Sequence, residues 1–298
     1  MTAPDASIII LTKNGGGNFP RLLESIYSQK YAGTFEVIMI DSGSTDGTLQ
    51  AAAGYPVRLL QIAPEQFHHA RTRNLGAGMA LGRYLVFITQ DALPLNDRWL
   101  QRLIDAFSDP EVGMVVGWQI PWDHVKPPEK FFYHYYFPDS RLIVQQGVSA
   151  GYRGNMFISN ANSALRRELW QKLNFSEDMF IGEDKELARR ILAAGGSIVY
   201  EPGAAVRHSH GHGLAETFSR QLDFGFAARR GAATIPGAEG SSIRRMLEYL
   251  GAEMRFLSSN NWTLWIPYSI IYEISRYGGF LLGKSGVVRG PLARKRKI

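Results

Sequence analysis

The feature that most constrains the fold of this chain is a regular alternation of short apolar runs with helix-patterned stretches through its first half. The runs are rich in β-branched residues, as buried strands are. Between them, apolar residues recur at helical spacing, as at Leu22, Leu23 and Ile26. Strands that alternate with helices pair in parallel, so the pattern predicts an α/β fold whose sheet is covered on both faces. The predicted strands are residues 7–12, 36–41, 57–62, 84–89 and 112–118.

The alternation stops after Pro121. An aromatic-rich stretch at residues 131–137 is interpreted as an irregular excursion or an edge hairpin, whose rings serve packing rather than ligand binding. Helical periodicity returns at residues 166–173 and 184–194, and a segment rich in Gly, Pro and Ser at residues 231–242 separates these from two further helices. The predicted domains are residues 1–235 and a C-terminal helical region at residues 236–298.

Composition excludes several classes of protein. The chain has 298 residues, 45% of them hydrophobic, which is enough apolar mass for a large core and argues against disorder. It contains no cysteine, so a metal ion must be bound by oxygen or imidazole, and no cysteine nucleophile exists. No basic and apolar leader precedes Ser7, so we expect a cytoplasmic protein.

The net charge of +6 is concentrated at the carboxyl end. Six basic residues and no acid follow Gly283; they equal the whole excess and leave a near-neutral body. This argues against nucleic acid as a partner and favours contact of the tail with an anionic membrane surface. A solvated basic end is the alternative. The six residues are Lys284, Arg289, Arg294, Lys295, Arg296 and Lys297.

Residues 262–283 are apolar, but Pro267 and several charged or glycine positions make them unsuited to cross a bilayer. On a helix, their apolar and polar residues separate onto two faces. An apolar face that begins near two tryptophans and precedes a basic tail is typical of an interfacial element, so we predict peripheral association with the inner face of the cell membrane. Packing on the core or on a partner is the alternative. The apolar face holds Ile266, Ile270, Ile274, Tyr277 and Leu281, and the polar face holds Ser269, Glu273 and Arg276.

Polar residues lie at the ends of the predicted strands, where parallel sheets bind ligands. Thr12 and Asn14 lie at the end of the first strand, and Asp41 ends the second. Asp41 can accept hydrogen bonds from a ribose or a base, and a structural role for it is harder to find. Asp46 is explained equally well as the cap of a helix that begins near Thr48.

A candidate metal ligand follows the fourth strand. Asp91 can bind a divalent cation, and hard oxygen ligands favour Mg²⁺ or Mn²⁺, which neutralise a diphosphate. Arg73 offers donors for phosphate or base oxygens, although it and Arg71 could instead form surface ion pairs. Three histidines alternate at residues 208–212, and one of them joining Asp91 at the cation is a sharper hypothesis than a separate zinc site.

Two adjacent acids, Glu183 and Asp184, open a predicted helix. Carboxylates are favoured at helix starts by the helix dipole, so capping is one explanation. The other is chemical, because a carboxylate beside a substrate hydroxyl can take its proton as the hydroxyl attacks.

In this order, the segments resemble the inverting family 2 glycosyltransferases with the GT-A fold. The resemblance spans about residues 5–230, through residues 12–14, 41–48, 73–74, 90–92 and 183–184. Resemblance to the dTDP-rhamnosyltransferase-like branch is carried by residues 89–94, 159–164 and 206–210.

The resemblance implies a role for each matching residue. Asp184 would be the catalytic base, and Asp91 would bind the metal that bridges the donor diphosphate. The family's usual Asp-x-Asp is here Gln90-Asp91-Ala92, which leaves one carboxylate, and His208 would supply the missing ligand. The residues implied to bind the nucleotide are Thr12, Asn14, Asp41, Arg73, Gln90 and Asp91.

We therefore expect a GT-A-type nucleotide-sugar-binding domain with a mainly parallel central sheet, plus a C-terminal helical appendage. The resemblance implies a hexosyltransferase that moves a sugar, with rhamnose as the first expectation, from dTDP-rhamnose or a UDP-sugar. The acceptor would be a hydroxyl of a surface glycan or of a lipid-linked precursor.

Two other functions are weighed. A sugar-phosphate nucleotidyltransferase would need a basic cluster after a glycine-rich segment, which residues 15–17 lack. A non-catalytic glycan-binding or membrane-scaffold protein would have lost the base or the metal acid, and both Asp184 and Asp91 are present.

Overall fold

The computed structural model describes residues 3–137, 142–144, 157–229 and 242–287. Within them the chain forms one nine-stranded sheet, and each strand that the sequence pattern predicts is present. The strands are β1 (Ala6–Thr12), β2 (Phe35–Asp41), β3 (Val57–Gln61), β4 (Tyr84–Thr89), β5 (Leu93–Pro94), β6 (Val112–Ile120), β7 (Leu142–Val144), β8 (Asn162–Arg166) and β9 (Ser197–Arg207).

The sheet is mainly parallel, as predicted. Strands β3, β2, β1 and β4 lie side by side in that order and all run parallel. Beyond β4, strand β8 runs antiparallel to both β4 and β6, whereas β6 and β9 are parallel. Short strands β5 and β7 pair antiparallel with β9. Of the antiparallel strands, β7 and β8 come after Pro121, where the strand and helix alternation of the sequence ends, whereas β5 comes before it.

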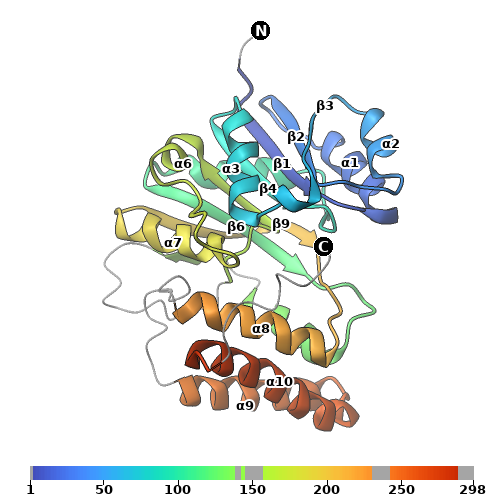
Figure 1. The fold of residues 1–298 in the computed structure, drawn as a ribbon, viewed down its shortest axis with the longest axis vertical. Coiled ribbons are helices and arrows are strands. Elements are labelled where there is room, and N and C mark those ends of the chain that lie inside the picture. The colour runs from blue at the N-terminus through green and yellow to red at the C-terminus, as the bar shows by residue number, and fades with distance from the viewer. Residues whose placement is uncertain (1–2, 138–141, 145–156, 230–241, 288–298) are drawn as a thin grey trace.

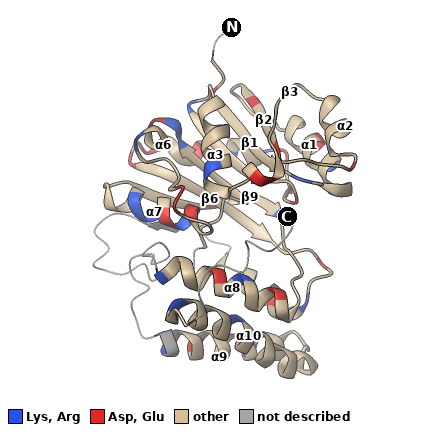
Figure 2. Cartoon of the chain, viewed as in Figure 1, with Lys and Arg blue, Asp and Glu red and all other residues tan. Residues whose placement is uncertain are grey.

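Helices cover both faces of the sheet, because both sides of its strands are apolar. On one face lie α1 (Phe19–Tyr27), α2 (Thr48–Ala53) and α4 (Trp99–Asp105). On the other lie α3 (His69–Met79), α6 (Arg167–Leu173) and α7 (Glu183–Ala193). On the face drawn in Figure 2, acidic and basic residues are interspersed over this sheet domain.

The aromatic-rich stretch is a helix, α5 (Pro127–Tyr136), so its interpretation as an irregular excursion or edge hairpin was wrong. Two prolines begin the helix, at positions where a missing N–H costs nothing. The Phe131 ring contacts Tyr249 and Phe256 of α9 (Ser242–Ser259), with centroids 4.9 and 5.3 Å apart. This contact with a helix distant in sequence stabilises a conformation that local composition did not indicate.

Three helices form a separate layer beside the sheet domain: α8 (Leu214–Arg229), α9 and α10 (Ile266–Ser285) (Figure 1). Helices α8 and α10 are in close backbone contact, because a Cβ atom added to Gly279 or Gly283 would strike a carbonyl of α8. The predicted domain boundary after residue 235 lies outside the described residues, and α8 before it packs on α10 after it. Of the helices that the structure describes, none combines the length and hydropathy that crossing a membrane requires.

Candidate active site

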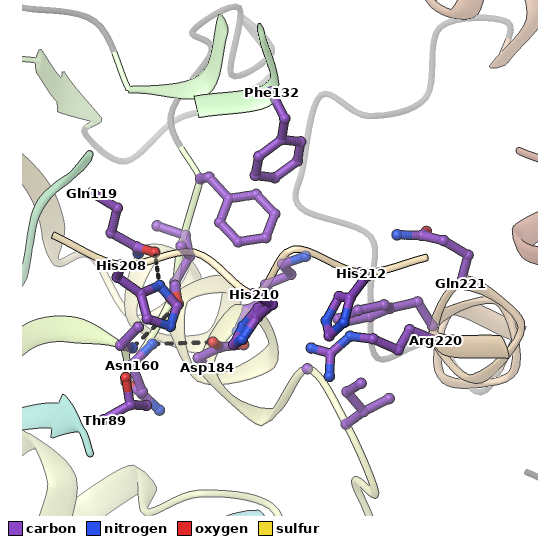
Figure 3. A pocket seen from close by; sticks show the side chains of 18 of the residues that line it. Thr89, Gln119, Phe132, Asn160, Asp184, His208, His210, His212, Arg220 and Gln221 are labelled. Carbon is purple, nitrogen blue, oxygen red and sulfur yellow. Dashed lines mark hydrogen bonds between the residues drawn. The ribbon is translucent and has the colours of Figure 1, made fainter. Parts of the chain in front are cut away.

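A cavity of about 330 Å³ lies between the sheet domain and the helical layer (Figure 3). Its walls come from the end of β4, the start of α7, the loop after β9, and helices α5, α8 and α10. The sequence-predicted residues Arg73, Asp184 and His208 line it. Residues far apart in the chain therefore meet in one site.

Asp184 lies in the first turn of α7, on the cavity wall. Gly182 precedes this helix with a φ of 82°, a left-handed conformation that glycine adopts without strain. The Asp184 carboxylate accepts hydrogen bonds from the backbone N–H groups of Asn160 (3.2 Å) and Lys185 (2.8 Å). Burial, and then the charge of Glu183, raise the pKa of Asp184. A carboxylate with a raised pKa is a stronger base than an exposed one.

Glu183, which also lines the cavity, is engaged in an ion pair. Its Oε1 accepts a hydrogen bond from Arg73 Nη1 at 2.5 Å, and both side chains are nearly buried. Arg73, predicted to contact a base or phosphate, thus contacts an acid of α7 while it also lines the cavity. Arg71 forms a surface ion pair with Glu177 at 3.2 Å, the alternative that the sequence left open.

Lys185 is a cation on the cavity wall that sequence reasoning missed. Its Nζ lies 4.2 Å from the ring centroid of Phe157 and 4.7 Å from that of Phe224. Burial lowers the pKa of Lys185. The charge of Asp184 opposes this effect of burial on Lys185, whose ammonium group lies beside two aromatic rings.

Asp91, His208 and His210 form a possible metal site. Within the described residues, ligand atoms of these three lie within 4.8 Å of one another. His208 Nε2 is 3.5 Å from Asp91 Oδ1, and His210 Nδ1 is 3.5 Å from Asp91 Oδ2. Figure 3 shows His208, His210 and His212 in a row across the cavity. Sequence reasoning paired only His208 with Asp91. The alternating spacing of the histidines was the signal that could have indicated His210 as a second histidine ligand.

The surroundings of His208 fit a metal ligand. Its Nδ1 lies 2.9 Å from Gln119 Oε1, an acceptor, which favours the tautomer with the proton on Nδ1 and the lone pair on Nε2. Nε2 is buried and has no hydrogen-bond partner among the residues that are described. An imidazole nitrogen that lies beside a carboxylate and a second imidazole is an arrangement that a divalent cation can satisfy. The residues present therefore fit the implied Mg²⁺ or Mn²⁺.

Thr12, Asn14 and Asp41 lie together at the carboxyl ends of β1 and β2, in a loop cluster outside the cavity lining. Both oxygens of buried Asp41 accept hydrogen bonds, from Thr12 Oγ1 (3.2 Å), the Gly43 N–H (3.0 Å), and the Ser44 N–H (2.9 Å) and hydroxyl (2.5 Å). The expectation that a structural role for Asp41 is hard to find was wrong, because the carboxylate orders its own turn.

The other polar residues of these loops are also engaged. Asn14 Oδ1 accepts the Thr45 N–H at 2.8 Å, and Asp46 Oδ1 accepts the Thr48 N–H at 3.0 Å, the capping contact that was one of the two expectations. The Gln90 amide bonds both the N–H (2.8 Å) and the carbonyl (3.0 Å) of Lys13. Gln90 thus ties the end of β4 to that of β1.

Aromatic side chains from three helices complete the cavity. Phe132 and Tyr133 come from α5, Phe224 from α8 and Tyr272 from α10. The sequence interpretation assigned the rings of α5 to packing. This is correct for Phe131, but Phe132 and Tyr133 also line the cavity. The cavity-lining residues of α8 and α10 carried no sequence signal, since only the packing of the helical layer brings them here.

Comparison with known proteins agrees with this architecture. The model of the family "Glycosyl transferase family 2" matches residues 7–173. The O-antigen chain rhamnosyltransferase RfbN of Salmonella typhimurium is 30% identical over 286 residues, 93% of this chain and 89% of that protein. The O-antigen chain rhamnosyltransferase WbaN of Salmonella anatum is 30% identical over 288 residues, 94% and 90% of the two chains.

Solved structures share the fold. The mannosyltransferase PcManGT from Pyrobaculum calidifontis, in complex with GDP-Man and Mn²⁺, has a TM-score of 0.64 at 20% identity and covers 95% of this chain and 89% of its own. S. aureus TarS 1-349 in complex with UDP-GlcNAc has a TM-score of 0.55 at 14% identity, covering 95% and 91%. The expected GT-A-type α/β fold with C-terminal helices is confirmed. The chain belongs to glycosyl transferase family 2, and it is a glycosyltransferase.

Proposed function

We propose that this glycosyltransferase moves a rhamnosyl group from dTDP-rhamnose to a hydroxyl of a surface glycan or its lipid-linked precursor, with inversion at the anomeric carbon. The observation that carries the proposal is one cavity lined by the raised-pKa carboxylate Asp184 and by two histidines of the Asp91 cluster. The rhamnosyl choice is supported by the names of the two Salmonella relatives.

Asp184 acts as the general base. Its carboxylate accepts the proton of the acceptor hydroxyl while that oxygen forms a bond to the anomeric carbon. The bond from this carbon to the diphosphate oxygen breaks on the opposite face, and its electron pair leaves with the nucleoside diphosphate. Glu183 does not compete for the proton, because Arg73 holds its carboxylate in a buried ion pair.

Asp91, His208 and His210 would hold the divalent cation. When bound, the cation neutralises charge on the diphosphate as it leaves. Mg²⁺ prefers oxygen ligands throughout, whereas imidazole nitrogen suits transition-metal ions, so one carboxylate with two imidazoles favours Mn²⁺ over Mg²⁺. Gln119 orients the ring of His208 for this role.

The loop cluster of Thr12, Asn14, Asp41 and Gln90 would bind the nucleoside, with buried Thr12 and Asp41 holding the turn in place and Asn14 lying exposed beside the ligand. The aromatic side of the cavity, with Phe132, Tyr133 and Phe224, offers ring faces on which acceptor sugars can stack. We further propose that the enzyme works in the cytoplasm, peripherally on the inner face of the cell membrane.

A donor screen tests the function. The full chain is mixed with dTDP-rhamnose, GDP-mannose or UDP-GlcNAc, and binding and slow donor hydrolysis are measured with Mn²⁺ present. We expect dTDP-rhamnose to be bound and hydrolysed in preference, and NMR of the released sugar to show the inverted anomer first. Preference for another sugar would overturn the rhamnosyl assignment, and binding of no nucleotide sugar would overturn the proposed reaction.

A further inference from the structure

Helix α10 is packed with its polar side inward and its apolar side outward. Ser269 and Glu273 are buried, whereas Ile270 is exposed and Ile274 is 67% exposed. Ile271 and Leu281 are exposed as well. A helix on the surface of a water-soluble domain has the reverse arrangement, with its apolar stripe toward the core. Of the two faces that the sequence predicts for this helix, the polar face packs against the rest of the protein.

The cause of this orientation is the contact with α8. Gly279 lies against the carbonyl of Phe218, and Gly283 against that of Leu222, with no room for a Cβ atom on either glycine. Glycines spaced four apart let two helix backbones approach closely, as they do in helix pairs inside membranes. Because glycine and polar residues form much of the inner side of α10, four of its large apolar residues are left exposed.

Aromatic and lysine side chains lie together at the amino-terminal end of α10, and the lysines come from the start of α5. Trp262, Trp265 and Tyr268 lie there, and Lys126 Nζ lies 2.9 Å from the Tyr268 hydroxyl. Lys130 Nζ is 5.4 Å from the ring centroid of Trp262. Tryptophan and tyrosine with nearby lysine are enriched where a protein meets the headgroup region of a bilayer. Leu264, beside them in the chain, is 94% exposed.

Charge distinguishes the possible partners of this face. Glu273 is the acid of α10, and it is buried and paired with Arg276 (Nη2 to Oε2, 2.6 Å). The exposed charge of the helix is Lys284, and the sequence after residue 287 adds five basic residues and no acid. In a dimer formed through this face, the α10 helix of a second copy would offer these cations no exposed acid, because Glu273 is buried. An anionic lipid surface attracts them.

We propose that the outer face of α10, formed by Ile270, Ile271, Ile274 and Leu281, docks on an anionic lipid bilayer. Leu264 and the aromatic end of the helix would lie at the headgroups. This inference deepens the proposed function and rests on it for its purpose, because a lipid-linked acceptor lies in that bilayer. Tyr272 and Arg276, on the inner side of the same helix, line the cavity that holds Asp184.

The test uses the full chain and vesicles of phosphatidylglycerol and phosphatidylcholine in equal parts, with phosphatidylcholine alone as the comparison. In flotation, we expect Ile270→Ser with Ile274→Ser to lower the fraction bound to anionic vesicles at least about tenfold. The matched control is Leu59→Ser with Leu81→Ser, two exposed leucines of the sheet domain, which should bind like the parent chain. Truncation after Val287, beyond the end of α10, or high salt should also weaken binding.

Equal vesicle binding by the parent and the α10 variant overturns the proposal, as does binding by neither. Sedimentation velocity without lipid provides a second readout. A parent dimer that the α10 variant converts to monomer would assign the face to a second copy of the chain and would also overturn it. Donor hydrolysis in solution is measured on the same samples. We expect it to be unchanged in the α10 variant, so failure of docking is distinguishable from failure of the proposed reaction.

Discussion

The sheet domain and the helical layer differ in what surrounds their buried acids. In β1, Ile8, Ile9 and Ile10 are buried, and the carboxylate of Asp41 at the end of the neighbouring strand has every hydrogen bond that it needs. In the helical layer, the carboxylate of Glu253 is buried beside the like charge of Glu273, while Ile274 is exposed. A buried carboxylate and an exposed isoleucine each make folding in water less favourable.

The difference indicates what each region is adapted to. The strand ends of the sheet domain are held by hydrogen bonds, so their loops can present ligand-binding groups in a fixed geometry. The helical layer breaks the rules of a stable water-soluble helix, and such local conflicts are expected where function rather than stability selects the residues. The following predictions test this contrast, beginning with the largest expected effect.

Catalysis should depend on Asp184, where the sheet domain meets the cavity. Asp184→Asn keeps the size of the side chain but removes the base, so turnover should fall about 100-fold or more while donor affinity stays nearly constant. Turnover and donor binding are measured separately, by product formation and calorimetry. Asp178→Asn, an exposed acid outside the cavity lining, serves as the control.

The pH profile sharpens this prediction. Because the pKa of Asp184 is raised, the base becomes protonated at a higher pH than an ordinary aspartate, and kcat/KM should fall as the pH drops through that raised value. Near-normal turnover of Asp184→Asn would move the role of base to another group, with Glu183 the first to examine.

Metal binding should depend on His210 as well as on Asp91 and His208. His210→Asn removes one ligand and should weaken Mn²⁺ binding by the full chain about tenfold or more, measured by the loss of the free Mn²⁺ signal in electron paramagnetic resonance. His124→Asn, an exposed histidine outside the cluster, should have no effect. Unchanged Mn²⁺ affinity in His210→Asn, or tighter binding of Mg²⁺ than of Mn²⁺ by the parent, would contradict the ligand set.

Stability should reveal the buried acid of the helical layer. Burial, and then the charge of Glu273, raise the pKa of Glu253 to about 7 from an ordinary 4.5, although a hydrogen bond with Ser269 and the charge of Arg276 oppose this. Between these two pH values the folded protein holds a proton that the unfolded chain has released, so the free energy of unfolding should decrease as the pH rises. Glu253→Gln removes this effect and should stabilise the protein at pH 8 by about 1–3 kcal/mol.

Urea unfolding of the parent and the variant at pH 5 and pH 8 measures this difference. Glu248→Gln, an exposed acid on the same helix, should change stability little, since surface ion pairs contribute little. If Glu253→Gln destabilises the protein at both pH values, the carboxylate has a stabilising partner and the contrast between the two regions fails at this position.

Sequence patterns predicted the sheet domain well because its determinants are local. A β-branched run such as residues 84–89 is buried on both sides, so pattern and strand coincide. Periodicity also sorted the residues of α10 onto the correct two faces. It could not tell which face packs inward, because that depends on the glycine contacts with α8. The helix α5 and the cavity residues of α8 and α10 depend on tertiary contacts in the same way.

The glycine contacts of α8 and α10 have a mechanical consequence. At Gly279 and Gly283 the backbones of the two helices touch, and no side chain of α10 lies there that could rearrange, so we expect the two helices to move as one rigid unit. One side of this helix pair lines the cavity, and the other side is the outer face of α10. If lipid lies against that outer face, the thickness of a helix, about 10 Å, sets the height of the cavity wall above the bilayer. The helix pair would then select acceptors by the length of the spacer between their lipid and the attacking hydroxyl.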